Sequence, residues 1–306
     1  QVGKTTIMNN LPLKKQKLLV NGQDVEIAEV FQKYSNIESY LKIYLNNALN
    51  GYLLIDEFQY IPEISTMLKL LTDKNENLRI ICTGSSSLDI LQKAEESLAG
   101  RVRRIEVYSL SFAEYLQFVD KALYNRFLKF NSVTSSAVAG NQIKYRLFEY
   151  LIYGGLPRVA IANDPEDKIQ LLNDIYQTYL LRDVMSYVKN EDAVGFNKLI
   201  KLLAAQTGNL INNNNLSKTT GLTYKKCEEY VYLLEQMYII KLLAPYTTNK
   251  RKELTKMKKV YFCDTGIRNM IYNSFNNIEV RVDNGNIFEN YVLLELLKLC
   301  PPVSKI

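Results

Sequence analysis

Histidine is absent from the sequence, which has 306 residues. Its absence excludes Ser-His-Asp hydrolysis, Cys-His proteolysis and any metal site that needs an imidazole ligand. The chemistry of the chain must therefore use carboxylates, lysine, arginine and hydroxyl groups. Glycine and proline are also few, with 13 and 7 copies, while 47% of the residues are hydrophobic and 23% are charged. This composition is typical of a folded protein, and the length allows two or three domains.

Cysteine is scarce as well, and its spacing excludes two further kinds of site. The four cysteines are Cys82, Cys227, Cys263 and Cys300. They lack the paired spacing of a zinc site, and the chain is too long for a small disulfide framework, so we interpret them as buried free thiols. The sequence also lacks an apolar run of about 18 residues and the N-terminal pattern of a signal peptide. We therefore expect a cytoplasmic protein with no membrane partner.

A buried strand that ends in two carboxylates is the most informative stretch, with the sequence GYLLIDEFQ at residues 51–59. Its apolar run predicts a parallel strand that delivers Asp56 and Glu57 to the carboxyl edge of a sheet, where α/β proteins place their chemistry. Many core strands end at an acid that only faces water, so this pattern alone is moderately specific. The sequence GKTT at residues 3–6, the closing half of a phosphate-binding loop, makes the combination specific.

Together the two motifs predict a nucleotide site with divided roles. In such a loop, backbone N–H groups hold phosphate oxygens, a lysine adds positive charge and the following hydroxyl binds Mg²⁺. Lys4 and Thr5 fit these roles, Asp56 would order the metal, and Glu57 would act as the general base that polarises the attacking water. The predicted ligands are ATP and Mg²⁺, and the predicted binding residues are Gly3, Lys4, Thr5, Thr6 and Asp56.

Strands alternate with helices over the first part of the chain, which specifies an α/β fold with a doubly wound parallel sheet. The expected helices span residues 5–11, 37–49 and 64–71, and the expected strands span residues 17–20, 51–56, 78–83 and 103–108. A helix beginning at Ser111 carries a capping box with Glu114. Because a complete phosphate loop begins five positions before Gly3, we expect the sequence to be a fragment that lacks the first strand.

Several polar residues near the predicted site have two interpretations each. Thr83 and Ser85 follow the strand next to the acids and would sense the γ-phosphate, or they would cap the following helix. Arg101, Arg158 and Arg182 are cations placed to approach the γ-phosphate, from this chain or from a neighbouring subunit. The alternative for each arginine is a solvated or ion-paired surface residue.

The strands stop after about residue 121, and periodic apolar residues predict a helical lid, bent at the GGLP turn of residues 154–157 beside the nucleotide. Residues 196–246 then predict a winged helix-turn-helix. Its expected order is a helix, a polar loop at residues 212–215, a short helix, a turn at residues 221–223, a helix at residues 224–237 and a strand at residues 239–243.

Basic residues in this region are candidates for contact with nucleic acid. The helix at residues 224–237 presents Tyr224, Lys225 and Lys226 outward, although Glu228 and Glu229 weaken the case for DNA. A charged hairpin tip at residues 250–259 contains Lys250, Arg251 and Lys252 and would follow a phosphate backbone or remain a solvated loop. The net charge of +6 and pI near 8.9 permit such contact without requiring it. Winged helices also serve as protein-binding modules, so a protein partner or a homo-oligomer stays open.

An ordered set of segments resembles the prokaryotic AAA+ superfamily of predicted ATPases. The segments are residues 1–6, 54–59, 83–86, 98–101, 154–157, 181–183 and 262–266. The resemblance implies an AAA-type P-loop core at residues 1–120, a helical lid at 121–192, a winged helix at 193–248 and the start of a restriction-endonuclease-like α/β domain at 249–306. It also implies ATP and Mg²⁺ at the site described above.

The resemblance makes Glu289 the first acid of a nuclease-like metal site, whose other acid and lysine are expected beyond Ile306, so we do not expect nuclease activity here. Two departures from the family are Ser109, where a proline is usual, and Arg158, where an acid is common. We interpret Asp264 as a helix cap rather than a metal ligand.

The family's sheet order places the missing first strand centrally. We therefore expect this stretch, expressed alone, to bind ATP weakly and to aggregate through open strand edges. The functional hypotheses are an ATPase that drives a conformational switch, a nucleic-acid-binding module with a degenerate nucleotide site, and a protein-interaction scaffold.

Overall fold

The computed structural model describes residues 2–46, 49–84, 101–130, 137–178, 184–246 and 256–299. Contacts within the chain divide it into two compact units. One unit comprises residues 3–106, and the other comprises residues 107–306 with the first two residues of the chain.

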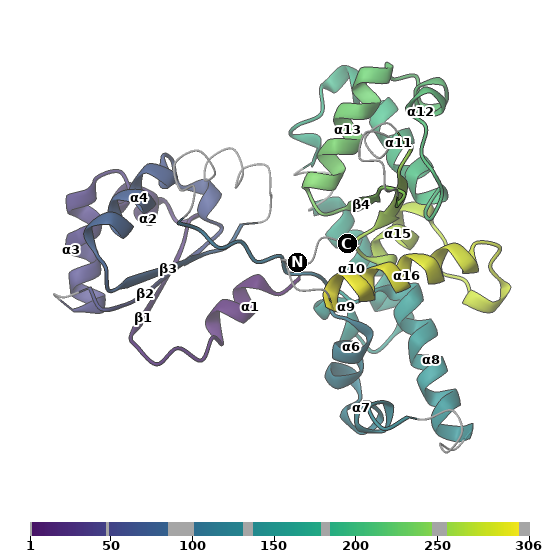
Figure 1. The fold of residues 1–306 in the computed structure, drawn as a ribbon, viewed down its shortest axis with the longest axis horizontal. Coiled ribbons are helices and arrows are strands. Elements are labelled where there is room, and N and C mark those ends of the chain that lie inside the picture. Colours follow the sequence, from purple (N-terminus) through teal and green to yellow (C-terminus); the bar gives the residue numbers. More distant parts are fainter. Residues whose placement is uncertain are drawn as a thin grey trace. The chain divides into compact units, whose positions relative to one another are not determined.

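The sheet of the first unit is parallel, with three strands in the order in which they occur along the chain (Figure 1). The strands are β1 (Lys17–Asn21), β2 (Gly51–Asp56) and β3 (Leu78–Cys82). Asn21 pairs with Asp56, and Ile55 pairs with Cys82, so the three strands end at the same edge. The prediction of a mixed α/β fold with a parallel sheet is confirmed.

One core with the sheet buries the apolar sides of α2 (Val25–Val30), α3 (Tyr34–Leu45), α4 (Ile64–Lys74) and the short 3₁₀ helix η1 (Phe58–Tyr60) after β2. The helix α1 (Lys4–Asn9) buries Met8 outside that core. Ile37, Leu41 and Leu45 of α3 meet the sheet at helical spacing. The helix ends at Leu45, four residues earlier than expected, because Asn46 adopts a positive φ of 70°.

The predicted strand at residues 103–108 is wrong. These residues are outside both sheets. Their apolar side chains are exposed, with Ile105 at 70% and Val107 at 39%. An alternating pattern forms a strand only when a neighbour accepts its ladder hydrogen bonds, and β3 pairs with β2 alone among the strands that the structure describes.

Among the described residues, the second unit begins with five helices, of which the first four contribute to an aromatic core. They are α6 (Phe112–Val119), α7 (Lys121–Phe127), α8 (Ala137–Tyr153), α9 (Pro157–Ala160) and α10 (Pro165–Ile175). The predicted capping box is present at the start of α6, where Ser111 and Glu114 exchange hydrogen bonds. The ring of Phe112 meets the ring of Tyr150 edge to face, with centroids 5.7 Å apart.

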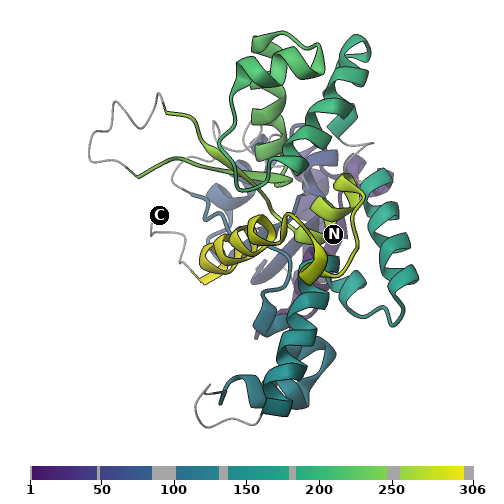
Figure 2. The ribbon, with the colours of Figure 1, turned by 90° about the vertical axis from the view of Figure 1, so that its right-hand side faces the viewer.

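A second group of helices is followed by a pair of antiparallel strands (Figure 2). The helices are η3 (Asn190–Asp192), α11 (Ala193–Ala205), α12 (Asn213–Thr220) and α13 (Tyr224–Gln236), and the strands are β4 (Ile240–Leu243) and β5 (Lys259–Phe262). The turn predicted between α12 and α13 is confirmed: Gly221 has a φ of 80°, and Thr223 caps α13. The polar loop predicted at residues 212–215 is wrong, because Asn212 caps α12 and the helix begins at Asn213.

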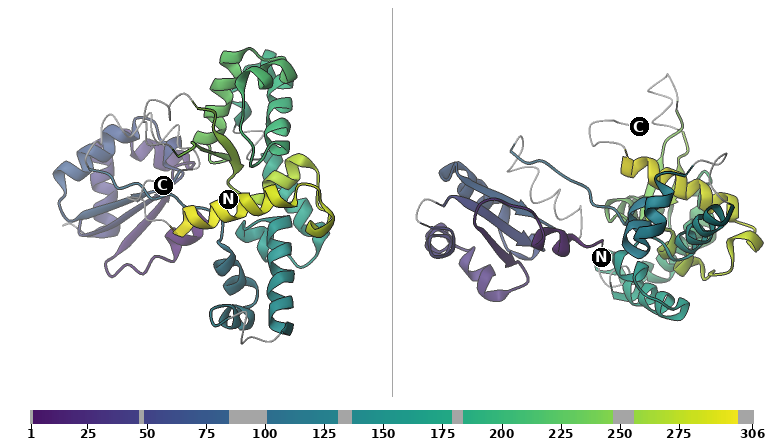
Figure 3. Two further views of the ribbon diagram at one scale, coloured as in Figure 1. Left: turned by 45° about the vertical axis from the view of Figure 1, so that its right-hand side comes forward. Right: turned by 90° about the horizontal axis from the view of Figure 1, so that it is seen from below.

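The last elements are α15 (Thr265–Tyr272), η4 (Ile278–Val280) and α16 (Asn284–Leu299). Within the second unit, α16 runs between α6–α8 on one side and α11–α13 on the other (Figures 1 and 3). Its Asn290 amide bonds both the N–H and the carbonyl of Phe262 in β5, at 2.7 and 2.9 Å. Glu295 accepts from the N–H of Phe112, so α16 binds both helical groups. Across the described ranges, no helix has the length and apolarity needed to span a membrane.

Candidate nucleotide site

The predicted site lies at the carboxyl edge of the sheet, where two turns meet closely. The N–H of Gly22, just after β1, donates to the carbonyl of Asp56 at 2.8 Å. A Cβ on Gly22 would lie 2.4 Å from the carbonyl oxygen of Glu57, so only glycine allows this approach.

Asp56 is the centre of the site, with only 6% of its surface exposed. Its Oδ2 accepts from the hydroxyl of Thr5 at 2.6 Å, and its Oδ1 accepts from the hydroxyl of Thr83. The Thr83 hydroxyl also accepts from the N–H of Glu57 at 3.4 Å. The predicted residues from the loop, the acidic strand and the sensor strand are therefore brought together.

Lys4 lies next to this group at the start of α1. Its ammonium donates to the carbonyl of Gly84 at 2.6 Å. Burial lowers the pKa of Lys4, and the charges of Glu57 and Asp56 partly offset this effect. Gly3 precedes the helix with a left-handed φ of 88°.

Glu57 follows β2 in an unusual backbone conformation. Its φ of 50° and ψ of 46° are left-handed, which is uncommon for a residue with a Cβ. One oxygen of its carboxylate, Oε2, accepts from the side-chain amide of Gln59 at 2.5 Å. The sequence placed Gln59 in the acidic motif but indicated no role for it.

The residues present fit a nucleotide with Mg²⁺. Thr5 and Asp56 supply a hydroxyl and a carboxylate in contact, which are oxygen ligands of the kind that Mg²⁺ uses. Thr6 is exposed in the same turn of α1. The described residues contain no group of three or more acidic or cysteine side chains that could hold a metal unaided.

The structure describes two of the arginine and sensor candidates that remain, Arg101 and Arg158. Arg101 lies on the surface in an ion pair with Asp73, at 3.4 Å, rather than with Asp56 or Glu57. Arg158 is exposed in α9 of the second unit. Ser85 and Arg182 lie outside the described residues.

The nucleic-acid candidates divide into exposed and paired residues. Tyr224, with 49% of its surface exposed, and Lys225 face solvent at the start of α13. Lys226 instead pairs with Asp192 and Glu229, at 3.5 and 3.3 Å. Three further candidates, Lys250, Arg251 and Lys252, are outside the ranges that the structure describes.

Glu289 lies on α16 and already has two partners. Its Oε1 accepts from the ammonium of Lys259 and from the hydroxyl of Tyr261, both at 2.6 Å. These two bonds lower the pKa of Glu289. The carboxylate therefore has a structural role in joining α16 to β5.

Asp264 caps α15, as predicted, and also accepts a hydrogen bond from the GGLP turn. Its Oδ1 accepts from the N–H of Ile267 at 3.2 Å, and its Oδ2 accepts from the N–H of Gly155 at 2.9 Å. Burial raises the pKa of Asp264 despite these bonds. The GGLP and DTG motifs, separate in the sequence, thus form one junction.

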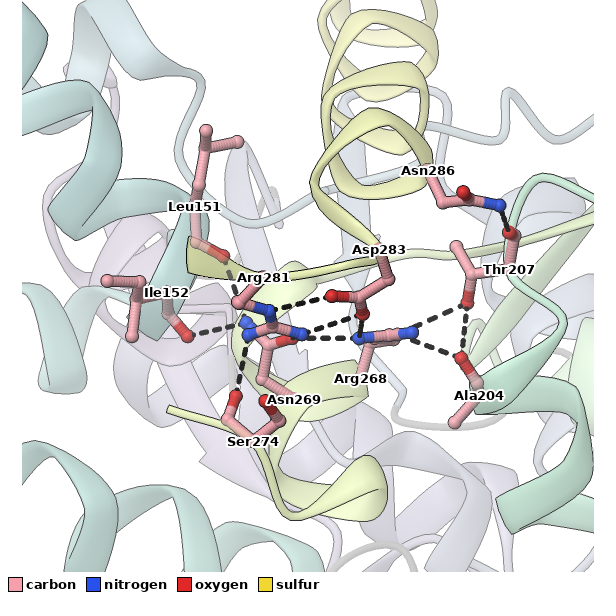
Figure 4. A network of polar contacts seen from close by, with 10 residues as sticks. All are labelled: Leu151, Ile152, Ala204, Thr207, Arg268, Asn269, Ser274, Arg281, Asp283 and Asn286. Atoms are coloured by element: carbon pink, nitrogen blue, oxygen red, sulfur yellow. Dashed lines mark hydrogen bonds and ion pairs between the residues drawn. The ribbon is translucent and has the colours of Figure 1, made fainter. Parts of the chain in front are cut away.

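Sequence reasoning missed a buried polar network in the second unit (Figure 4). Arg268 and Arg281 both bond the carboxylate of Asp283, at 2.5 and 2.8 Å. Arg268 also donates to the carbonyl of Ala204 at the end of α11, and Asn269 donates to the carbonyl of Ile152 in α8. The network joins segments that the sequence analysis assigned to three different regions, and no local signal indicated it.

Comparison with known proteins supports the interpretation of the N-terminal part. Residues 1–116 match a family model described as an AAA domain, and residues 144–277 match a domain of unknown function (DUF8612). A protein of Methanocaldococcus jannaschii is 27% identical over 292 residues, covering 94% of this chain and 62% of its own length. A protein of Haemophilus influenzae is 26% identical over 255 residues, covering 81% of this chain and 58% of its own length.

A Mycobacterium tuberculosis protein is 25% identical over 259 residues, covering 84% of this chain and 53% of its own length. All three relatives are named as uncharacterized proteins. The chain thus spans little more than half the length of the curated relatives that it matches. The AAA-domain match over residues 1–116, together with the contacts that join Thr5, Asp56 and Thr83, supports an AAA-type P-loop ATPase at the N-terminus.

Proposed function

We propose that the chain binds ATP with Mg²⁺ and hydrolyses it, and that the two nucleotide states drive a conformational switch. The observation that carries this proposal is the buried Asp56, whose two carboxylate oxygens accept from the hydroxyls of Thr5 and Thr83. A hydroxyl of the phosphate loop and a sensor hydroxyl that both bond a strand acid are parts that recur at sites of phosphoryl transfer.

Each side chain has a defined task in this proposal. Lys4 leaves the Gly84 carbonyl and binds the β- and γ-phosphates, while Thr5 and Asp56 hold the metal. Bound Mg²⁺ neutralises charge that develops on the phosphate oxygens. Glu57 accepts a proton from the attacking water. The Thr83 hydroxyl holds the carboxylate of Asp56 and the backbone N–H of Glu57 in position.

Hydrolysis by the full-length protein tests the proposal, with Lys4→Ala and Glu57→Gln as variants. Lys4→Ala should weaken ATP binding by about tenfold or more, because it removes the phosphate-binding charge. Glu57→Gln should lower kcat by about 100-fold or more and leave ATP affinity equal or higher, because only the proton acceptor is lost. Arg79→Ala is a matched control, since Arg79 lies on β3 but bonds the carbonyl of Glu76. Turnover that persists in Glu57→Gln would contradict the proposal.

Nucleic-acid binding through a winged helix is the second candidate function. The favouring observation is the order α12, tight turn, α13 and an antiparallel strand pair, with Tyr224 and Lys225 exposed at the start of α13. Lys256 and Lys258, just before β5, are exposed as well. Basic side chains on a helix and on the adjoining hairpin would follow a phosphate backbone.

Salt-dependent DNA binding tests this second function. Lys225→Ala and Lys258→Ala should each weaken binding and reduce the salt slope by about one. Lys226→Ala is the control, because its ammonium is already paired with Asp192 and Glu229. Failure of the full-length protein to retain DNA even at low salt would contradict this second function.

A further inference from the structure

We propose that Gln59 is a positioning residue that holds the carboxylate of Glu57 ready to accept the proton from water. This inference rests on the proposed ATP hydrolysis. The observation behind it is the hydrogen bond of 2.5 Å from the Gln59 amide to Oε2 of Glu57.

The turn that carries both residues is tightly held. The N–H of Phe58 donates to the carbonyl of Thr83 at 3.0 Å, which fastens the turn to the strand beside β2. The Phe58 ring is 4% exposed in the core, and Gln59 is 9% exposed. Because the backbone on both sides is fixed, the remaining freedom of Glu57 lies mainly in its side chain, which the Gln59 amide restrains.

The chemistry of the amide suits this task. An amide neither gains nor loses a proton at neutral pH, so it orients the carboxylate without competing for the proton. The bond uses Oε2 and leaves Oε1 to accept from water. The charge of Glu57 also raises the pKa of Lys4 and so partly offsets the effect of burial on that ammonium. Holding a general base in one orientation lowers the entropic cost of the reactive geometry.

Two substitutions separate positioning from packing. Gln59→Met keeps the length of the side chain but removes the donor, and Gln59→Glu keeps the shape but replaces the donating group with an oxygen. Gln32→Met and Gln32→Glu are matched controls, because Gln32 is an exposed glutamine of the same unit. The measurements on the full chain are kcat, KM, the affinity for a non-hydrolysable ATP analogue and the melting temperature.

Positioning predicts that Gln59→Met lowers kcat about tenfold with KM and analogue affinity unchanged, part of the about 10²–10⁴-fold effect of a general base. Gln59→Glu should lower kcat at least as much, because a second carboxylate repels the first. In a Glu57→Gln background, Gln59→Met should reduce turnover less than twofold further, since the two residues act as one unit.

Several outcomes overturn the inference. A near-normal kcat in Gln59→Glu and Gln59→Met, with Glu57→Gln still inactive, rejects positioning but retains the proposed function. Losses of melting temperature and analogue affinity that parallel the loss of kcat assign Gln59 a packing role. Unchanged turnover in Glu57→Gln rejects the proposed function itself, and the role of Gln59 with it.

Discussion

Asp56 is the residue at which the separate motifs of the sequence meet. It lies 51 positions after Thr5 and 27 positions before Thr83, and both hydroxyls bond its carboxylate. Since Asp56 is 6% exposed, these two hydroxyls replace the water that an ionised carboxylate would otherwise bind. The site is therefore sensitive to the loss of either hydroxyl.

Thr83→Val tests this dependence at the scale of one residue. The change removes the donor to Asp56 and the acceptor for the N–H of Glu57 while keeping the volume of the side chain. We expect kcat to fall by about 10- to 100-fold with a small effect on ATP affinity, measured by steady-state hydrolysis and analogue binding. Thr72→Val should have no effect on kcat, because the Thr72 hydroxyl bonds only carbonyls of α4.

The lowered pKa of Lys4 predicts that the affinity for ATP depends on pH. Burial lowers the pKa of its ammonium below the usual 10.5, and only the charged form attracts phosphate. Affinity for a non-hydrolysable ATP analogue should therefore stay constant near neutral pH and fall as the pH rises through this lowered value. Lys4→Arg should bind without that alkaline loss, because arginine stays charged. An identical pH profile in both proteins would contradict the assignment.

At the scale of elements, the junction between the GGLP turn and α15 depends on the absence of side chains. A Cβ on Gly266 would lie 2.1 Å from the carbonyl oxygen of Tyr153, and a Cβ on Gly155 would lie 2.4 Å from that of Leu110. Both neighbours are backbone atoms, which cannot move away by changing a rotamer. This close packing explains the glycines Gly155 and Gly266.

Gly266→Ala should consequently destabilise the second unit by about 2 kcal/mol or more, because the α8 backbone must shift to admit a methyl group. Chemical denaturation followed by circular dichroism measures the change. Gly285→Ala is the matched control: a Cβ there meets nothing within 4 Å, and alanine favours the helix α16. Equal stability of the two variants would show that the α8–α15 contact is looser than described.

At the scale of the whole molecule, the residues that meet around Asp56 lie in the unit of residues 3–106, and the network around Asp283 holds the other unit together. Burial opposes the ionisation of Asp283, but bonds from Arg281 and the charge of Arg268 outweigh it and lower the pKa to about 2. A folded pKa below the unfolded value of about 3.9 stabilises the fold above that value. We expect about 2 kcal/mol of stability to be lost as the pH falls from about 4 to about 2.

Asp283→Asn should remove this acid-dependent loss and cost about 3 kcal/mol at neutral pH, because it leaves two buried guanidinium groups without a counter-charge. Urea denaturation between pH 2 and 7 gives both quantities, and hydrogen exchange assigns them to the second unit. Glu279→Gln breaks the exposed pair with Lys144 and should cost less than about 0.5 kcal/mol. A similar cost for the two variants would argue against the network as a stabilising centre.

Much of the local structure was predictable because it depends on neighbours along the chain. The strand GYLLID, the capping box at Ser111 and the turn at Gly221 follow from spacing and from the backbone preferences of single residues. The errors have local causes as well. Asn212 was placed in a loop although asparagine is a favoured helix cap, and residues 103–108 had a strand pattern but no partner strand.

The order of the motifs was sufficient to predict a helix after Gly3 and a buried strand that ends at Asp56, because both depend on short segments of the chain. Only the tertiary structure showed that Asp264 accepts a hydrogen bond from the N–H of Gly155 and that Asp283 forms an ion pair with Arg268. These contacts join distant segments inside the protein, where burial makes an unpaired charge costly and a partner necessary. Spacing along a chain does not encode which distant groups meet, so the folded packing decides it.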